Sequence, residues 1–430
     1  MKRSEIVDID KRHVWHPYTP MQQYLAEADP LVIVRAEGSR LFDADGRSFI
    51  DGNASWWTSV LGHGHPRLLA TLREQAQTLC HTSLAGITHP PIAELCQELE
   101  RVVPPALPHY FFSDDGSTSV EVAMKLCLQY FAQNGAPERR RFVALDGAFH
   151  GETLGVSALG GVEVFRRPFA SVLLDCIHVP SAADGFERAF AALTEMMASH
   201  AGQVAAIVLE PMLQGAAGMR TYDTEYLRHA RRLADEHGAF LVLDEVFTGY
   251  GRTGPMWAHE HAGVVPDVMC CAKGFSGGMF PMAATFVCER IFEGFLGVPE
   301  RAFFYGHTFT GNPLGAAVAA EVLRVYRDEA VLEGAARKAE RIAHAFEALA
   351  QLDGVANVRH LGMVGALELS GTGGYLERSG WRVYEAALQR GAYLRPLGNV
   401  VYVAPALNIP DPDLDALLDI LRAAVTTLTR

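Results

Sequence analysis

Short apolar runs alternate with amphipathic stretches between about residue 65 and residue 325. The apolar runs have the length of buried strands, whereas the longer stretches repeat apolar residues at helical spacing. The clearest strands are residues 110–112, 141–145, 205–209, 240–243 and 268–271, and the clearest helices are residues 117–131 and 224–237. Strands that alternate with helices in this way favour a mostly parallel sheet wrapped by helices, so we expect an α/β fold.

The two ends of the chain differ from this central region. Residues 1–60 predict an irregular arm with short strands at residues 32–34 and 39–43. Towards the C-terminus, helices and strands mix, at residues 315–329, 332–349, 363–369, 380–390, 400–403 and 413–428. We therefore expect three parts. They are an arm over residues 1–60 that contributes to the small domain, a large domain over residues 61–325, and a smaller α+β domain over residues 326–430.

Composition and charge narrow the class of protein. A chain of 430 residues is long for one core, and 49% hydrophobic with 20% charged residues is ordinary for a soluble enzyme. The net charge of −13 argues against nucleic acid or an anionic membrane as partner. Seven cysteines without CxxC spacing indicate reduced thiols in a reducing compartment. The first ten residues lack an apolar core and no apolar run reaches the length of a membrane span, so we expect a cytoplasmic protein.

A lysine stands between a predicted buried strand and a glycine-rich turn. The strand at residues 268–271 leads to Lys273, and Gly-Phe-Ser-Gly-Gly follows. The predicted strand at residues 240–243 ends in the same way at Asp244. Because strand-end residues meet at the carboxyl edge of an α/β sheet, where ligands bind, we expect the two side chains in one site. A lysine that can bond to a carbonyl and an acid that can face a pyridinium nitrogen are what pyridoxal phosphate chemistry needs.

Other segments could bind a cofactor. Gly116 and Ser117 open a predicted helix, where free N–H groups favour a phosphate. The alternative is that the segment is only an N-cap, and the two aspartates before it oppose an anion. Phe149 could stack on a planar cofactor or belong to the core. Thr308 lies in a turn-rich segment whose hydroxyls could serve a phosphate or a structural loop. Three acids at successive strand ends look like the wall of a site: Glu210, Asp244 and Glu245. For Glu245, a solvated loop acid is the better interpretation.

Three further features suggest a substrate pocket. Adjacent tryptophans in a glycine-rich loop, Trp56 and Trp57, are poor core material and fit the wall of a pocket for a flat or aliphatic ligand. His63 and His65 have a spacing that permits a metal, but no third ligand is near in the sequence, so we expect no metal catalysis. Arg395, between apolar neighbours, is a candidate carboxylate clamp, and a surface ion pair is the alternative.

Taken together, these segments resemble the class III aminotransferases of pyridoxal phosphate fold type I. Residues 244–254 follow the pattern D-E-x-x-T-G-x-G-R-T-G, and together with Lys273 downstream they are specific for this class. The sequence W-H-P-Y-T at residues 15–19 and the tryptophan pair are specific for the branch that serves biotin synthesis. The matching segments cover nearly the whole chain.

The resemblance implies roles for the matching residues. Lys273 would hold the cofactor and move the proton, and Asp244 would stabilise the protonated pyridine nitrogen. Phe149 would stack on the cofactor ring. Gly116 and Ser117 would bind the phosphate, together with Thr308 from the partner subunit of a homodimer. The substrate pocket would be formed by Tyr18, which also counts among the catalytic residues, and by Trp56, Trp57, Gly306 and Arg395, with the arginine taking the substrate carboxylate.

The activity that this branch implies is the conversion of 8-amino-7-oxononanoate to 7,8-diaminononanoate. Two positions depart from the branch, because Phe149 stands where its members mostly carry tyrosine and Asp115 where they mostly carry serine. The amino donor therefore stays open between S-adenosylmethionine, the usual one, and lysine. The alternatives are a broad ω-aminotransferase, an aminomutase or racemase with the same cofactor, and a nucleotide-binding or structural protein, although no G-x-G-x-x-G follows a strand.

Overall fold

The largest sheet of the computed structural model, which describes residues 1–371 and 373–429, has seven strands in the order β4-β12-β11-β10-β7-β5-β6. The strands are β4 (His109–Ser113), β5 (Arg141–Leu145), β6 (Cys176–Val179), β7 (Val204–Leu209), β10 (Phe240–Asp244), β11 (Val268–Cys271) and β12 (Ala283–Val287). Only the two pairings of β12 are antiparallel. The predicted mostly parallel sheet is therefore confirmed, with β12 as an antiparallel strand that the sequence pattern did not reveal.

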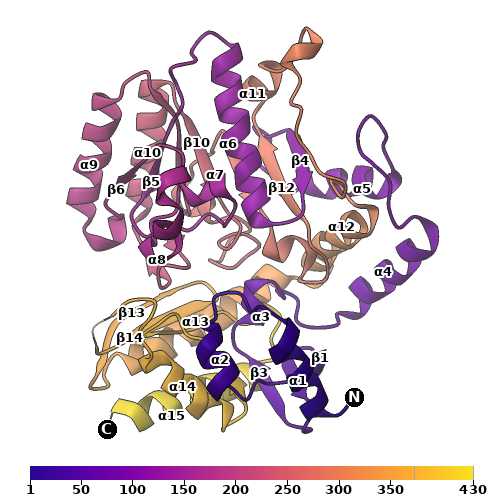
Figure 1. Cartoon of the computed structure of the whole chain (residues 1–430), viewed down its shortest axis with the longest axis vertical. Coiled ribbons are helices and arrows are strands. Elements are labelled where there is room, and N and C mark those ends of the chain that lie inside the picture. Colours follow the sequence, from indigo (N-terminus) through magenta and orange to yellow (C-terminus); the bar gives the residue numbers. More distant parts are fainter. Residues whose placement is uncertain (372, 430) are drawn as a thin grey trace.

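Helices cover this sheet, as the upper half of Figure 1 shows for α6 (Gly116–Gln133), α9 (Phe186–Ser199) and α10 (Thr224–His237). Every residue of β7 and β10 is buried, which explains why these strands read as continuous apolar runs without alternation. The two ends of α10 carry ordinary capping residues. The carboxylate of Asp223 accepts a hydrogen bond from the backbone N–H of Glu225, and Gly238 takes the left-handed conformation after the last turn.

The two ends of the chain share a second sheet, in the order β1-β2-β3-β15. Its strands are β1 (Ile33–Glu37), β2 (Arg40–Asp43), β3 (Ser48–Asp51) and β15 (Ala392–Tyr393), and β3 pairs with β15 in parallel. A third sheet contains β13 (Val355–Leu361), β14 (Val364–Leu369) and β16 (Val400–Val403). In the lower half of Figure 1 the indigo N-terminal and yellow C-terminal segments lie together. The three-part division with its boundaries stays a prediction.

The expectation of an irregular N-terminal arm is wrong for its first part. Residues there form α1 (Arg3–His13) and α2 (Met21–Glu27), neither of which has a buried residue. Polar contacts hold them, because the hydroxyl of Tyr24 donates to Asp10 at 2.6 Å and the ring of His16 lies 2.9 Å from the same carboxylate. A helix without a buried face carries no apolar period, so the pattern could not reveal it.

The remaining elements complete the chain. The helices are α3 (Ala54–Trp57), α4 (Pro66–Thr78), α5 (Pro90–Leu99), α7 (Leu154–Ser157), α8 (Glu163–Arg166), α11 (Glu289–Glu293), α12 (Pro313–Asp328), α13 (Val331–Leu349), α14 (Ser379–Leu388) and α15 (Asp411–Thr429), and the short strands are β8 (Leu213–Gln214) and β9 (Arg220–Thr221). Among the described residues, no helix is both long and apolar enough to cross a membrane.

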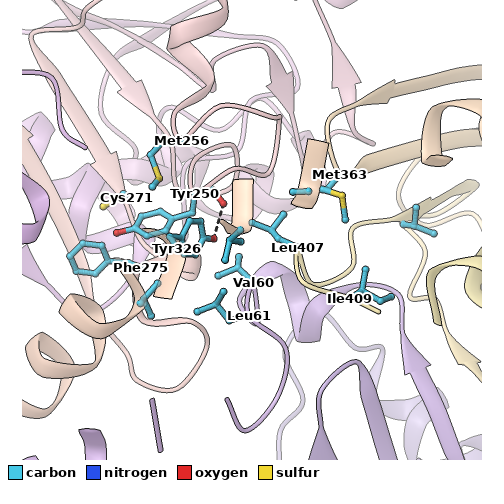
Figure 2. Close-up of a cluster of buried hydrophobic side chains, with 14 of the residues drawn as sticks. Val60, Leu61, Tyr250, Met256, Cys271, Phe275, Tyr326, Met363, Leu407 and Ile409 are labelled. Carbon is cyan, nitrogen blue, oxygen red and sulfur yellow. Dashed lines mark hydrogen bonds between the residues drawn. The ribbon is translucent and has the colours of Figure 1, made fainter. Parts of the chain in front are cut away.

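A buried apolar cluster connects the large sheet to the C-terminal segment (Figure 2). Tyr250 follows β10, Phe275 follows β11, and Tyr326 on α12 donates its hydroxyl to the backbone oxygen of Tyr250 at 2.9 Å. Leu407 and Ile409, which precede α15, pack into the same cluster. The cluster packs around the segments that follow β10 and β11, next to Asp244 at the end of β10 and Lys273 after β11.

Candidate active site

A cavity of about 560 Å³ lies at the carboxyl ends of β10 and β11. Its volume is in the range of small-molecule sites. Most of the predicted site residues line it: Tyr18, Trp56, Trp57, Gly116, Ser117, Phe149, Glu210, Asp244 and Lys273. The other three predicted residues, Gly306, Thr308 and Arg395, lie outside its lining. The expectation that Lys273 and Asp244 share one site is therefore met by the geometry.

Lys273 presents its amine inside the cavity from a left-handed backbone position, with φ of 43°. Its Nζ lies 4.4 Å from the ring centroid of Trp57 and 5.4 Å from that of Phe247. Burial lowers the pKa of Lys273 to about 8, although the charges of Asp244 and Glu210 oppose the shift. A large share of the amine is therefore neutral at mildly alkaline pH, so it can attack a carbonyl and accept a proton.

Asp244 is buried at the end of β10 and is held by two donors. The ring Nδ1 of His150 lies 2.7 Å from its Oδ2, and the backbone N–H of Val246 donates to its Oδ1 at 3.0 Å. Burial alone would lower the pKa of His150, but the hydrogen bond and charge of Asp244 outweigh it, so the pKa is raised. This favours the cationic ring, which pairs with the carboxylate of Asp244 in the cavity wall.

Two neighbouring acids have different places. Glu210 lines the cavity, and its carboxylate accepts hydrogen bonds from the backbone N–H groups of Phe149 at 3.0 Å and Gly215 at 2.9 Å. Burial raises the pKa of Glu210 to about 7. Glu245 is not the solvated loop acid that we expected, because it is only 1% exposed. It accepts from the N–H groups of Ala258 and His259, which begin a 3₁₀ turn and need acceptors.

The N-terminus of α6 opens on the cavity and leaves little room for side chains. A Cβ at Gly116 would lie 2.7 Å from a methyl group of Val246. Asp115 is the N-cap of the helix, and its Oδ1 accepts from the N–H of Thr118 at 2.8 Å. Serine is an equally good N-cap, so the aspartate preserves the local structure. Because the cap bonds to Thr118, the first N–H groups of the helix stay available to an anion.

The tryptophan pair forms an unusual turn, since φ is positive at each of Ala54, Ser55, Trp56 and Trp57. Trp57 is 5% exposed and donates its Nε1–H to the hydroxyl of Tyr402 at 3.0 Å, whereas Trp56 is 38% exposed. Both line the cavity, as predicted for a pocket wall.

Tyr18 meets the ring of Trp56 edge-on, at 5.4 Å between centroids, and extends this aromatic wall. Its hydroxyl donates to Glu152 at 2.6 Å. Burial, together with the hydrogen bond to Glu152, raises the pKa of Tyr18 and keeps the phenol neutral. Sequence reasoning did not single out Glu152, although the F-H-G-E run placed it two residues after His150. It also missed several apolar or aromatic lining residues, among them Val246, Phe165 and Tyr375.

Arg395 stands beside the aromatic wall. Its guanidinium carbon lies 4.8 Å from the ring centroid of Trp56 and 5.7 Å from that of Trp381. Its positive charge acts on the hydroxyls of Tyr375, which lines the cavity, and of Tyr393, and opposes the rise that burial causes in the pKa of each. Within residues 1–371 and 373–429 no carboxylate lies within the 4.0 Å of an ion pair with it. The surface ion pair therefore lacks a partner in the described part of this chain.

Gly306 and Thr308 are exposed and belong to a segment that lies outside the cavity. Phe304 and Phe309 of the same segment are 83% and 56% exposed. Exposed apolar groups in this number are typical of an interaction surface. The role of Thr308 at the site of a partner subunit stays a prediction.

The two histidines of the H-x-H motif face different acids. His63 lies 2.9 Å from Asp51, and His65 lies 3.4 Å from Glu329. In the described ranges no group of three His, Cys, Asp or Glu residues is placed to hold a metal ion. His63 thus contacts an acid at the end of β3, and His65 contacts an acid just after α12.

The residues of the cavity fit pyridoxal phosphate. The cavity offers an amine of lowered pKa, a buried carboxylate paired with His150, an aromatic ring at Phe149 and a helix N-terminus without side-chain bulk at Gly116. These groups match the aldehyde, the ring nitrogen, the ring face and the phosphate of that cofactor.

Comparison with known proteins gives the family. The model of aminotransferase class III matches residues 24–425. The adenosylmethionine-8-amino-7-oxononanoate aminotransferase of Geobacter sulfurreducens is 38% identical over 98% of this chain and 97% of its own length. The crystal structure of the enzyme of that name from Methanocaldococcus jannaschii has a TM-score of 0.96 and 31% identity, covering 99% of both chains. An (S)-enantioselective omega-transaminase from Thermomicrobium roseum has a TM-score of 0.94 and 29% identity over the full length of both chains. The chain therefore belongs to the class III aminotransferases and is a pyridoxal-phosphate-dependent enzyme.

Proposed function

We propose that this enzyme transfers an amino group from S-adenosylmethionine to 8-amino-7-oxononanoate and so forms 7,8-diaminononanoate for biotin synthesis. The observation that carries the proposal is Arg395, a cation without an acid partner in the described part of the chain, beside an aromatic wall. An acceptor with an aliphatic chain and a distal carboxylate matches both features, because the wall covers the chain and the guanidinium pairs with the anion. The names of several curated relatives support the same reaction.

Each catalytic residue has a role that follows from its surroundings. Pyridoxal phosphate, when bound, supplies a sink for the electron pair that remains when a C–H proton leaves. Asp244 holds its negative charge against the ring nitrogen, and His150 keeps that carboxylate in place. Lys273, once its amine is free, would carry the proton between the amine-bearing carbon of the substrate and the carbon of the cofactor's aldehyde group. The N–H groups of Gly116 and Ser117 bind the phosphate, and Phe149 packs on the ring.

The aromatic wall orients the substrate. Tyr18 and Trp56 lie on the side of the cavity next to Arg395, so they place the acceptor chain between the reacting carbon and the guanidinium. Glu152 accepts the hydrogen bond of the Tyr18 hydroxyl and fixes its ring. All seven cysteines are free thiols, which supports the proposal that the enzyme works in the cytoplasm.

A panel of amino donors tests this function. With 8-amino-7-oxononanoate as acceptor, S-adenosylmethionine should give diamine product in single-turnover experiments. If lysine is the effective donor instead, the proposed acceptor and product stand and the proposed donor is wrong. Rapid transamination of simple amines or 4-aminobutyrate, without turnover of the nine-carbon acceptor, would contradict the proposal in favour of a broad ω-aminotransferase.

We expect Arg395→Ala to raise the KM of the acceptor strongly. Leaving one partner of a buried charge pair alone costs about 2–5 kcal/mol, which here falls on the binding of the carboxylate. The donor half-reaction should lose less, because the donor carboxylate sits beside its reacting amine. Single-turnover kinetics of each half-reaction measure both effects. Arg390→Ala, an exposed arginine that follows α14, is the matched control and should behave as the parent enzyme. Small and equal losses in both half-reactions would show that Arg395 does not bind substrate.

A homodimer with shared sites forms part of the proposal. Thr308 lies on the exposed segment with Phe304 and Phe309, and we propose that this segment reaches the phosphate in the partner subunit. Mixing Lys273→Ala chains with chains of a Thr308 variant that binds cofactor poorly should restore activity. In the mixed dimer one site carries both defects and the other carries neither. Confirmed subunit exchange without recovery of activity would mean that each chain builds its own site.

A further inference from the structure

The turn that presents Trp56 is built from residues that resist its conformation. Left-handed backbone costs a residue other than glycine about 1–2 kcal/mol, and four such residues follow one another from Ala54 to Trp57. Within the turn, the N–H of Trp57 donates to the oxygen of Asn53 at 2.8 Å, and the N–H of Thr58 donates to that of Ala54 at 2.9 Å. These bonds and a third one, from the N–H of Ser59 to the oxygen of Ala54 at 3.1 Å, do not offset this cost, so the surrounding side chains have to hold the turn.

Asp51 supplies part of that support. Its buried carboxylate accepts hydrogen bonds from the N–H of Asn53 at 3.2 Å and from the N–H and hydroxyl of Ser55 at 2.8 and 3.0 Å. His63 lies 2.9 Å from the same carboxylate. Asp51 is thus bonded to both sides of the turn, and it fixes the direction in which Trp56 leaves the backbone.

Asn53 connects this turn to the segment that carries the arginine. Its side-chain oxygen accepts the backbone N–H of Arg395 at 2.6 Å, across 342 positions of sequence. Asn53 is only 1% exposed, and its amide nitrogen has no partner among the described residues. The asparagine therefore makes one side-chain hydrogen bond in the described chain, and that bond ties the backbone of Arg395 to the start of the turn that carries Trp56.

We propose that Asn53 is a positioning residue that holds Arg395 against Trp56 and thereby selects acceptors with a distal carboxylate. This inference rests on the proposed function for the identity of the acceptor. The recognition of a carboxylate by Arg395 can be tested without the proposed function, because any aliphatic monocarboxylate offers the same anion to the guanidinium. Asn53 touches neither the reacting atoms nor the cavity, so its effect passes through Arg395.

The test compares Asn53→Leu, which keeps the size and removes the acceptor oxygen, with Asn53→Asp, which restores that oxygen. The probes are nonanoate and its alcohol, 1-nonanol, bound to the cofactor-loaded enzyme and followed by tryptophan fluorescence. Asn53→Leu should weaken nonanoate by roughly tenfold, the upper range for one hydrogen bond, and leave the alcohol unchanged. Asn53→Asp should recover most of the affinity. In turnover, the leucine variant should raise the KM for the nine-carbon acceptor while kcat changes less.

Two further variants serve as controls. Asn408→Leu removes another asparagine that bonds to a distant backbone, the oxygen of Leu61, and should change neither probe. Asn53→Ala removes the same oxygen with less bulk and replaces the leucine variant if thermal unfolding shows that leucine disrupts the fold. Equal weakening of both probes, or no change in nonanoate affinity, overturns the positioning role. A parent enzyme that binds nonanoate but does not turn over 8-amino-7-oxononanoate would refute the proposed function alone.

Discussion

The Lys273→Ala variant should retain its fold and lose all measurable transamination. The amine sits at the end of β11, between the rings of Trp57 and Phe247, with its pKa lowered to about 8 by burial. No other amine is placed among the described lining residues of the cavity, so none can take over covalent attachment or proton transfer. The fold should survive, because a buried amine costs desolvation energy that alanine does not incur. Thermal unfolding and steady-state turnover measure the two halves of this expectation.

Chemical trapping identifies the attachment site directly. Borohydride reduction of the cofactor-loaded enzyme, followed by peptide mapping, should label Lys273 alone. Lys338 is a suitable internal comparison, because burial also lowers its pKa but its Nζ donates to the oxygen of Leu407 away from the cavity. Label on the exposed Lys125 in place of Lys273 would refute the assignment.

The Asp244→Asn variant should bind the cofactor and lose several orders of magnitude in the rate of both half-reactions. The amide keeps an oxygen for the N–H of Val246 but carries no charge to stabilise a protonated ring nitrogen. It also removes the anion that favours the cationic ring of His150. The absorbance of the bound cofactor would show that the variant retains it, and stopped-flow measurements would show the loss of rate in each half-reaction.

The adjacent acid provides a matched comparison. Glu245→Gln changes an equally buried carboxylate that bonds to Thr248, Ala258 and His259 and does not line the cavity. It should alter the free energy of unfolding more than the half-reaction rates. Near-normal rates in Asp244→Asn, or equal losses in the two variants, would show that Asp244 is not the partner of the ring.

The large sheet and the lysine–aspartate pair could be predicted because their signals are local. A strand buried on both faces is a continuous apolar run, and its last residue stands at the ligand edge, as Asp244 does. The antiparallel β12 could not be read in the same way, since apolar runs carry no information on direction. Glu245 shows a related limit, because its burial depends on a 3₁₀ turn that returns to it thirteen residues later.

The substrate side of the site depends on contacts between distant segments. The sequence marks Trp56 and Arg395 as unusual, but their proximity follows from the pairing of β3 with β15. The bond between Tyr18 and Glu152 joins the N-terminal segment to the loop between β5 and α7 in the same manner. Local sequence patterns do not encode such contacts, so neither the contact of Glu152 nor the left-handed turn could be predicted from the sequence.

The sheet that joins β3 to β15 also sets an order for biosynthesis. A ribosome releases the N-terminal strands first, yet β15 emerges only near the end of translation, and the ion pair of Arg40 with Asp413 spans 373 positions. The strands of the large sheet are all made before β15, so they can pair while β3 still lacks its partner. Nascent chains should therefore expose one edge of β3 for most of their synthesis. Limited proteolysis of stalled chains of increasing length would show protection at residues 48–51 only after residue 393 has emerged.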